Sequence, residues 1–184
     1  MPDDSNPPTD VGTIAAYAAA LADGIEAALP GWVVRCVERL LLAWRGDVDP
    51  AVRAEAEAEG ERARAEVGPQ VRALLGTDVD EQWTSPLHLV RRAVRFPTAV
   101  LRAAGVPPVQ RDSFAAHTFP DDVYNLSPAS FADVDPRLAE PGIEWGAAKA
   151  HVVLTRRRLS ERSERGPSGP AEGQERGAMS EGDG

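Results

Sequence analysis

The sequence predicts a small all-α domain of five to six helices, with an irregular, proline-rich segment and disordered termini. Apolar residues recur every three or four positions through residues 14–29, which is the spacing of one helix face. Asp-Pro and Ser-Pro dipeptides then mark helix starts, and the helical periodicity fails over residues 109–141. The hydrophobic fraction of 42% is ordinary for a globular protein. We therefore expect one helical domain over residues 11–158.

Two helices are expected before residue 46. Residues 14–29 form the first apolar stripe, and Pro30-Gly31 predicts the end of that helix. A second helix, from Trp32 to Arg45, has a narrow polar face, which indicates a central helix buried on most of its circumference. Its apolar residues include Val33, Val37, Leu40, Leu41 and Trp44.

Asp49-Pro50 is the next helix start, because the Asp side chain can accept hydrogen bonds from free amides and Pro is tolerated at the first helical position. The run to Glu66 is strongly helix-forming and carries charge pairs four residues apart. Gly68-Pro69 then predicts a break or a kink.

Ser85-Pro86 predicts the start of the following helix, again with a capping residue before a proline. Pro97 predicts a new helix start within this stretch, and Gly105 predicts its end. The last helix is expected over residues 143–157, although residues 150–155 are also compatible with a strand. We expect residues 1–10 and 159–184 to be disordered, because these polar, Pro- and Gly-rich stretches have little to bury.

Charge and cysteine usage favour a protein of the bacterial cytosol. The net charge of −9 argues against a general affinity for nucleic acid or anionic membrane. Cys36 is the only cysteine, so no internal disulfide can form, which suits a reducing compartment. The acidic N-terminus does not resemble a secretory signal, and no run approaches the roughly 20 apolar residues that span a bilayer. We expect a cytoplasmic protein with no transmembrane segment.

Three Asp-Val-Asp phrases stand at residues 47–49, 78–80 and 133–135. Such a pair of carboxylates can hold a divalent cation, but each phrase also precedes a helix-compatible stretch, where Asp acts as a cap. Capping explains all three with one mechanism, so we favour it. No histidine has a partner at zinc-ligand spacing, and no common catalytic motif is present. We therefore expect no metal, no cofactor and no recognisable catalytic residue.

Charge segregation is the most informative feature of the sequence. Residues 83–111 contain five arginines and no acid, whereas residues 112–155 contain seven acids. One interpretation is an anion site; the other, which we favour, is that the acidic segment folds back over the basic helices. We call four of these arginines the basic element: Arg91, Arg92, Arg95 and Arg102.

Two further sets of residues are candidates for function. Arg156, Arg157 and Arg158 end the last helix, where cations suit the helix dipole but also suit an anionic partner. A possible polar site combines four residues that would have to converge in space: His117, Asp121, Asp122 and Lys149.

The leading hypothesis is a non-enzymatic protein-interaction or regulatory protein, whose partner is another protein and whose contacts are the basic element and Arg156–Arg158. The first alternative is a nucleic-acid-binding protein that uses the basic stretch Arg91–Arg111. The second alternative is an enzyme with the polar site around His117 and Lys149. The sequence leaves the oligomeric state open.

Overall fold

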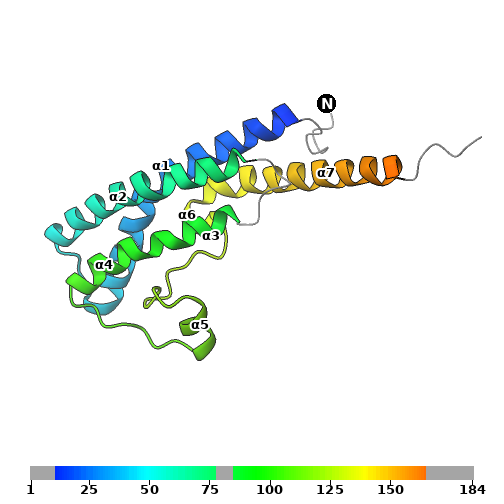
Figure 1. Ribbon diagram of the computed structural model, residues 1–184. Helices are drawn as coiled ribbons and strands as arrows, with labels where there is room; N and C mark the ends of the chain where they lie inside the picture. Colours follow the sequence, from blue (N-terminus) through cyan, green and yellow to red (C-terminus); the bar gives the residue numbers. More distant parts are fainter. Residues whose placement is uncertain (1–10, 78–84, 165–184) are drawn as a thin grey trace, which may run out of the picture.

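The computed structural model describes residues 11–77 and 85–164, and within these ranges the protein is helical with no strand. The prediction of a small all-α domain is confirmed. Helices α1 (Val11–Arg45) and α2 (Pro50–Leu75) form a long antiparallel pair (Figure 1), and all the other elements except α5 pack against this pair. Those elements are α3 (Pro86–Arg91), η2 (Arg92–Val94), α4 (Arg95–Ala103), α5 (Ser113–Thr118), α6 (Phe131–Val134), η3 (Pro136–Leu138) and α7 (Ala139–Glu164).

The predicted end of the first helix at Pro30 is wrong, because α1 runs through it to Arg45. An interior proline removes one hydrogen bond and crowds the preceding turn, which bends a helix without always ending it. The axis of α1 turns in its middle (Figure 1). Burial explains why the helix continues, since Leu29, Trp32 and Val33 on either side of Pro30 are all in the core.

The backbones of α1 and α2 approach closely at the bend. A Cβ atom on Gly60 would lie 2.8 Å from the Cα and carbonyl oxygen of Pro30, so only glycine fits there without a shift. Farther along, Arg72 of α2 pairs with Asp23 at 2.7 Å and also with Glu26 of α1. α2 is likewise continuous through Pro69, without a break at that residue.

The capping predictions are confirmed at both Asp-Val-Asp phrases that the structure describes. Asp49 accepts a hydrogen bond from the Ala51 amide at 2.7 Å and begins α2, and Asp135 accepts from the Arg137 amide at 2.9 Å and begins η3. The third phrase, at residues 78–80, lies outside the described residues. Asp133 caps α6 by accepting from the Ser130 amide at 2.8 Å.

The helical stretch is interrupted just before Pro97, and a new helix, α4, begins there as expected. The nitrogen of Pro97 has no hydrogen to donate to the carbonyl of Ala93, and the chain just before it tightens into the 3₁₀ turn η2 between α3 and α4. Ser85-Pro86 opens α3, and Gly105 follows α4 with a φ of 77°, in the left-handed region that favours glycine.

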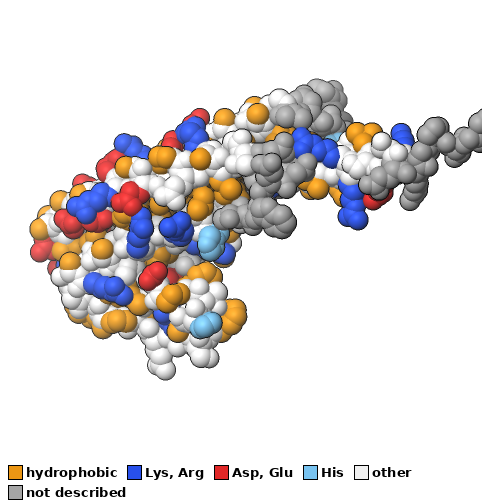
Figure 2. All heavy atoms as spheres, viewed as in Figure 1, with side chains coloured by type: hydrophobic (Ala, Val, Ile, Leu, Met, Phe, Trp, Pro, Cys, Tyr) orange, Lys and Arg blue, Asp and Glu red, His pale blue; other side chains and the backbone are white. Residues whose placement is uncertain are grey.

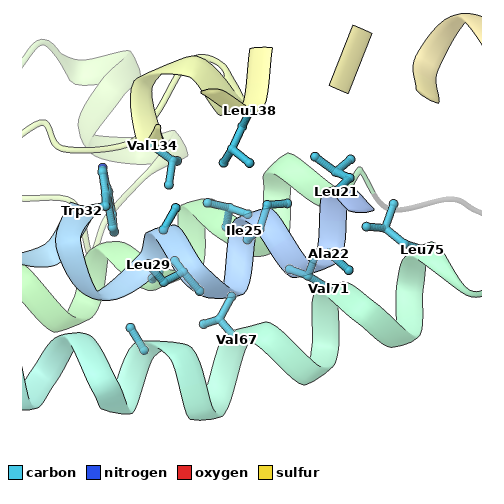
Figure 3. Packing of buried hydrophobic residues seen from close by; sticks show 14 of the residues in the cluster. Leu21, Ala22, Ile25, Leu29, Trp32, Val67, Val71, Leu75, Val134 and Leu138 are labelled. Atoms are coloured by element: carbon cyan, nitrogen blue, oxygen red, sulfur yellow. The ribbon is translucent and has the colours of Figure 1, made fainter. Parts of the chain in front are cut away.

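The main core lies between α1, α2, α3 and the α6–η3 turn. Leu21, Ile25 and Leu29 of α1 face Val67 and Val71 of α2, while Val134 and Leu138 cover the other side of α1 (Figure 3). A second cluster joins the end of α1 to α4 through Val37, Leu41, Val100, Leu101 and Tyr124. The Tyr124 hydroxyl donates to the Val106 carbonyl at 2.7 Å, which ties the irregular segment to this cluster.

α7 is a helix as predicted, but it is longer than expected. Residues 150–155 are helical, so the strand alternative is wrong, and the helix continues to Glu164, past the expected boundary at 158. The expected disorder at residues 1–10 and beyond residue 164 concerns positions outside the described residues. None of the described helices combines the length and the hydropathy needed to cross a bilayer.

Candidate functional site

The irregular segment and the basic element enclose a groove between them. The cavity, of about 280 Å³, is lined by His88, Arg91, Arg92 and Arg95 on one side and by residues 118–122 and Ser127 on the other. Figure 2 shows arginine side chains and an acidic side chain gathered on this face, between α3 and the segment that carries α5. The fold thus brings together three arginines of the basic element, without Arg102, and two members of the predicted polar site, Asp121 and Asp122.

Arg91 and Arg95 hold the fold together. Arg91 donates to the Pro128 carbonyl at 2.9 Å and lies 5.8 Å from the centre of the Phe119 ring. Arg95 pairs with Glu66 of α2 and lies 4.8 Å from the centre of the Phe96 ring. The irregular segment therefore does fold over α3, but the contacts are a carbonyl and a ring rather than carboxylates.

Arg92 and Arg102 remain as exposed cations of the basic element. Neither forms an ion pair with another residue of the described ranges. Two unpaired arginines on a short helical element are few for nucleic acid, where tight binding neutralises roughly 6–10 phosphates. This arrangement gives little support to the nucleic-acid alternative.

Asp122 is a structural carboxylate. It is 3% exposed and accepts hydrogen bonds from the amides of Leu126 at 2.6 Å and Ser127 at 2.8 Å, which close the turn behind the groove. Asp121 is exposed on the groove wall. The groove thus has arginine side chains on one side and the Asp121 carboxylate on the other, and His88 is part of the same lining.

His117 and Lys149 do not join this groove. His117 is exposed on α5, whereas Lys149 is on α7, and these two helices lie at opposite sides of the molecule (Figure 1). Partial burial lowers the pKa of the Lys149 ammonium below its ordinary value. Of the four residues of the predicted polar site, the groove therefore contains Asp121 and Asp122 but not His117 or Lys149.

The three arginines at the end of α7 lie on its outer half, which extends past the first turns of α1 (Figure 1). Arg157 and Arg158 are exposed, and Arg157 pairs with Glu161 at 3.2 Å. Leu154 and Leu159 are 55% and 59% exposed beside these cations, while Val152 of the same helix is buried in the main core. This part of α7 combines apolar and cationic groups on one exposed element.

Comparison with known proteins identifies no relative: no family model, no curated protein and no solved structure matches this chain. Function must therefore be argued from geometry.

Sequence reasoning missed three of the residues that line cavities. His88 precedes Arg91, Arg92 and Arg95 at helical spacing, which places all four residues on one face of a helix. Arg35 and Arg39 are one turn apart on α1 and line a larger groove, of about 690 Å³. Their partners come from residues 125–136, a separation along the chain that no local pattern reveals.

Proposed function

We propose that this is a non-enzymatic protein-interaction protein that binds its partner through the outer half of α7. The single observation that carries the proposal is the exposure of Leu154 and Leu159 on a helix that extends beyond the body of the domain. An exposed, unaccompanied leucine on a compact surface needs no explanation, but Leu154 and Leu159 are both exposed on an extended, arginine-rich helix, where a partner could bury them.

The charge of this segment indicates the chemistry of the partner. Residues 152–163 contain four arginines and one glutamate, in a chain whose net charge is −9. A local surplus of cations favours a partner with an apolar groove rimmed by acidic side chains. Nucleic acid is a less favourable partner, because leucine side chains gain nothing from phosphate, whereas an apolar protein groove buries them.

The test is affinity capture of partners from lysate of the source cells, at physiological salt and with nuclease present. The protein, Leu154→Ser/Leu159→Ser and Arg157→Gln/Arg158→Gln are compared by quantitative mass spectrometry. Leu42→Ser is the matched control, because Leu42 is 53% exposed on α1, away from α7.

We expect the leucine variant to lose at least about tenfold in recovery of a specific partner, since burying one leucine contributes about 1.5–3 kcal/mol and 1.4 kcal/mol is a factor of ten. The arginine variant should lose less, and the loss should shrink at high salt because surface charge pairs are screened. Equal recovery of every partner by the α7 variants and the Leu42 control would refute the proposal.

A further inference from the structure

The larger groove lies between α1 and the segment that leads into η3. Four residues of α1 line it at helical spacing, namely Trp32, Arg35, Cys36 and Arg39, and residues 125–129 and 132–136 form the opposite wall. Trp32 and Val134 face each other across part of this region (Figure 3). A volume of about 690 Å³ is within the range of roughly 300–1,000 Å³ that small-molecule sites occupy.

The opposite wall is held in place by hydrogen bonds from its own backbone. Asp122 binds the amides of Leu126 and Ser127, and Asp133 accepts from the amides of Ala129 and Ser130, both at 2.8 Å. Asn125 adopts a φ of 59°, in the left-handed region, where the chain turns into the groove. A wall organised this way exists before any ligand arrives, which lowers the entropy lost on binding.

The two arginines of the groove, Arg35 and Arg39, differ in their hydrogen-bond partners. Arg35 donates to the Val134 carbonyl, so its guanidinium spans the groove and is held there. Arg39 is exposed and forms no ion pair within the described part of the chain. A positioned guanidinium next to an uncommitted one, a single helical turn away, is a suitable arrangement for a carboxylate or a phosphate.

The two acids that line the groove, Asp133 and Asp135, are each held by other groups, and Asp135 also interacts electrostatically with Arg35. The carboxylate of Asp135 binds the Arg137 guanidinium at 2.7 Å, and Asp133 is used by backbone amides. The remaining lining is largely apolar: Leu126, Pro128, Ala129, Ala132, Val134 and Pro136. The groove thus has the guanidinium groups of Arg35 and Arg39 on the α1 side and apolar side chains on the opposite wall.

Cys36 lies on the α1 side of the groove, between Arg35 and Arg39. Burial raises the pKa of its thiol to about 12, even though Arg35 and Arg39 oppose the shift. The thiol therefore stays protonated and does not act as a nucleophile at neutral pH.

We propose that this groove is a binding site for a small organic anion, one with a carboxylate, sulfonate or phosphate head and an apolar body. The anionic head of the ligand binds Arg39 and the N–H groups of Arg35 that do not donate to Val134. The apolar body of the ligand lies against the wall formed by Leu126, Pro128 and Ala132. This site is separate from α7, so the proposal stands independently of the partner-binding function.

The test uses 8-anilino-1-naphthalenesulfonate, an aromatic anion whose fluorescence rises in an apolar site, and N-phenyl-1-naphthylamine, which has the same apolar body without the sulfonate. Titrations are made on the full chain and on Arg39→Gln, with Arg92→Gln as the matched control because Arg92 is an exposed arginine of the other groove. Far-UV circular dichroism checks that each variant is folded.

We expect saturable binding of one anionic probe per chain, weakened about tenfold by Arg39→Gln and unchanged by Arg92→Gln, since a charge-assisted hydrogen bond contributes about 1.5–3 kcal/mol. The neutral probe should bind the protein and Arg39→Gln equally. Absence of saturable binding, or equal loss of both probes in Arg39→Gln, or equal loss of the anionic probe in the two arginine variants, would overturn the proposal.

Discussion

Replacing Gly60 by alanine tests the crossing of α1 and α2. The added methyl would lie 2.8 Å from the Cα and carbonyl oxygen of Pro30, where carbon atoms normally stay about 3.5–4.0 Å apart. These are backbone atoms of another helix, so relief requires the helices to separate. Overpacking of this kind costs roughly 1–3 kcal/mol, against a gain of about 1 kcal/mol in helix propensity. Because the contact is to backbone, we expect a net destabilisation of about 1–2 kcal/mol.

Urea unfolding followed by circular dichroism measures this difference, with Gly146→Ala as the control. Gly146 is also in a helix, but a Cβ there meets nothing within 4 Å, so its replacement should stabilise the protein by about 0.4–1 kcal/mol. The opposite signs of two identical substitutions make the test specific. Equal or greater stability of Gly60→Ala would show that the helices do not approach closely at Pro30.

Three further predictions address single groups. Asp49→Ala removes the cap of α2 and should cost about 1 kcal/mol in urea unfolding, and no loss would show that the Ala51 amide needs no cap. Thr98→Val should stabilise the protein by roughly 1 kcal/mol, because the buried Thr98 hydroxyl has no partner in the described chain, and a loss of stability would reveal a partner. At pH 8, Cys36 should react with Ellman's reagent on the order of 10³-fold more slowly than an unfolded thiol, because its pKa is raised from 9.0 to about 12. The native thiol keeps its proton from pH 9 to 12, so stability should fall with pH across that window, and an ordinary reaction rate would contradict the burial.

Local signals predicted the helices well because caps and proline act within a few residues. Asp49 begins α2 with the expected side-chain cap, whereas Ser85 begins α3 with proline at the first position but without a side-chain cap. Pro30 was misjudged because its effect depends on what surrounds it. Leu29 and Val33 are fully buried on either side, and the burial gained by continuing the helix exceeds the cost of one bend.

The candidate site was less predictable, because charge along a chain does not reveal which atoms meet. The sequence predicted that acids of residues 112–155 cover Arg91 and Arg95, whereas Arg91 binds a carbonyl thirty-seven residues away and Arg95 binds an acid of α2. Arg35 and Arg39 share the narrow polar face of the predicted helix with Glu38, a pattern that does not indicate a groove. In the structure Glu38 pairs instead with Arg53, which leaves Arg39 facing the groove.

The grooves are lined by arginines although the chain has a net charge of −9, because several acids form hydrogen bonds with backbone amides close to them in the sequence. Asp112, Asp122 and Asp133 each accept hydrogen bonds from backbone amides near them, and these bonds build the turns of the irregular segment. A carboxylate whose oxygens point at its own backbone is poorly placed to pair with arginines on the opposite wall. The same residues that make the segment acidic therefore leave Arg39 exposed at the larger groove, and the anion-binding proposal rests on that groove and not on the protein's overall charge.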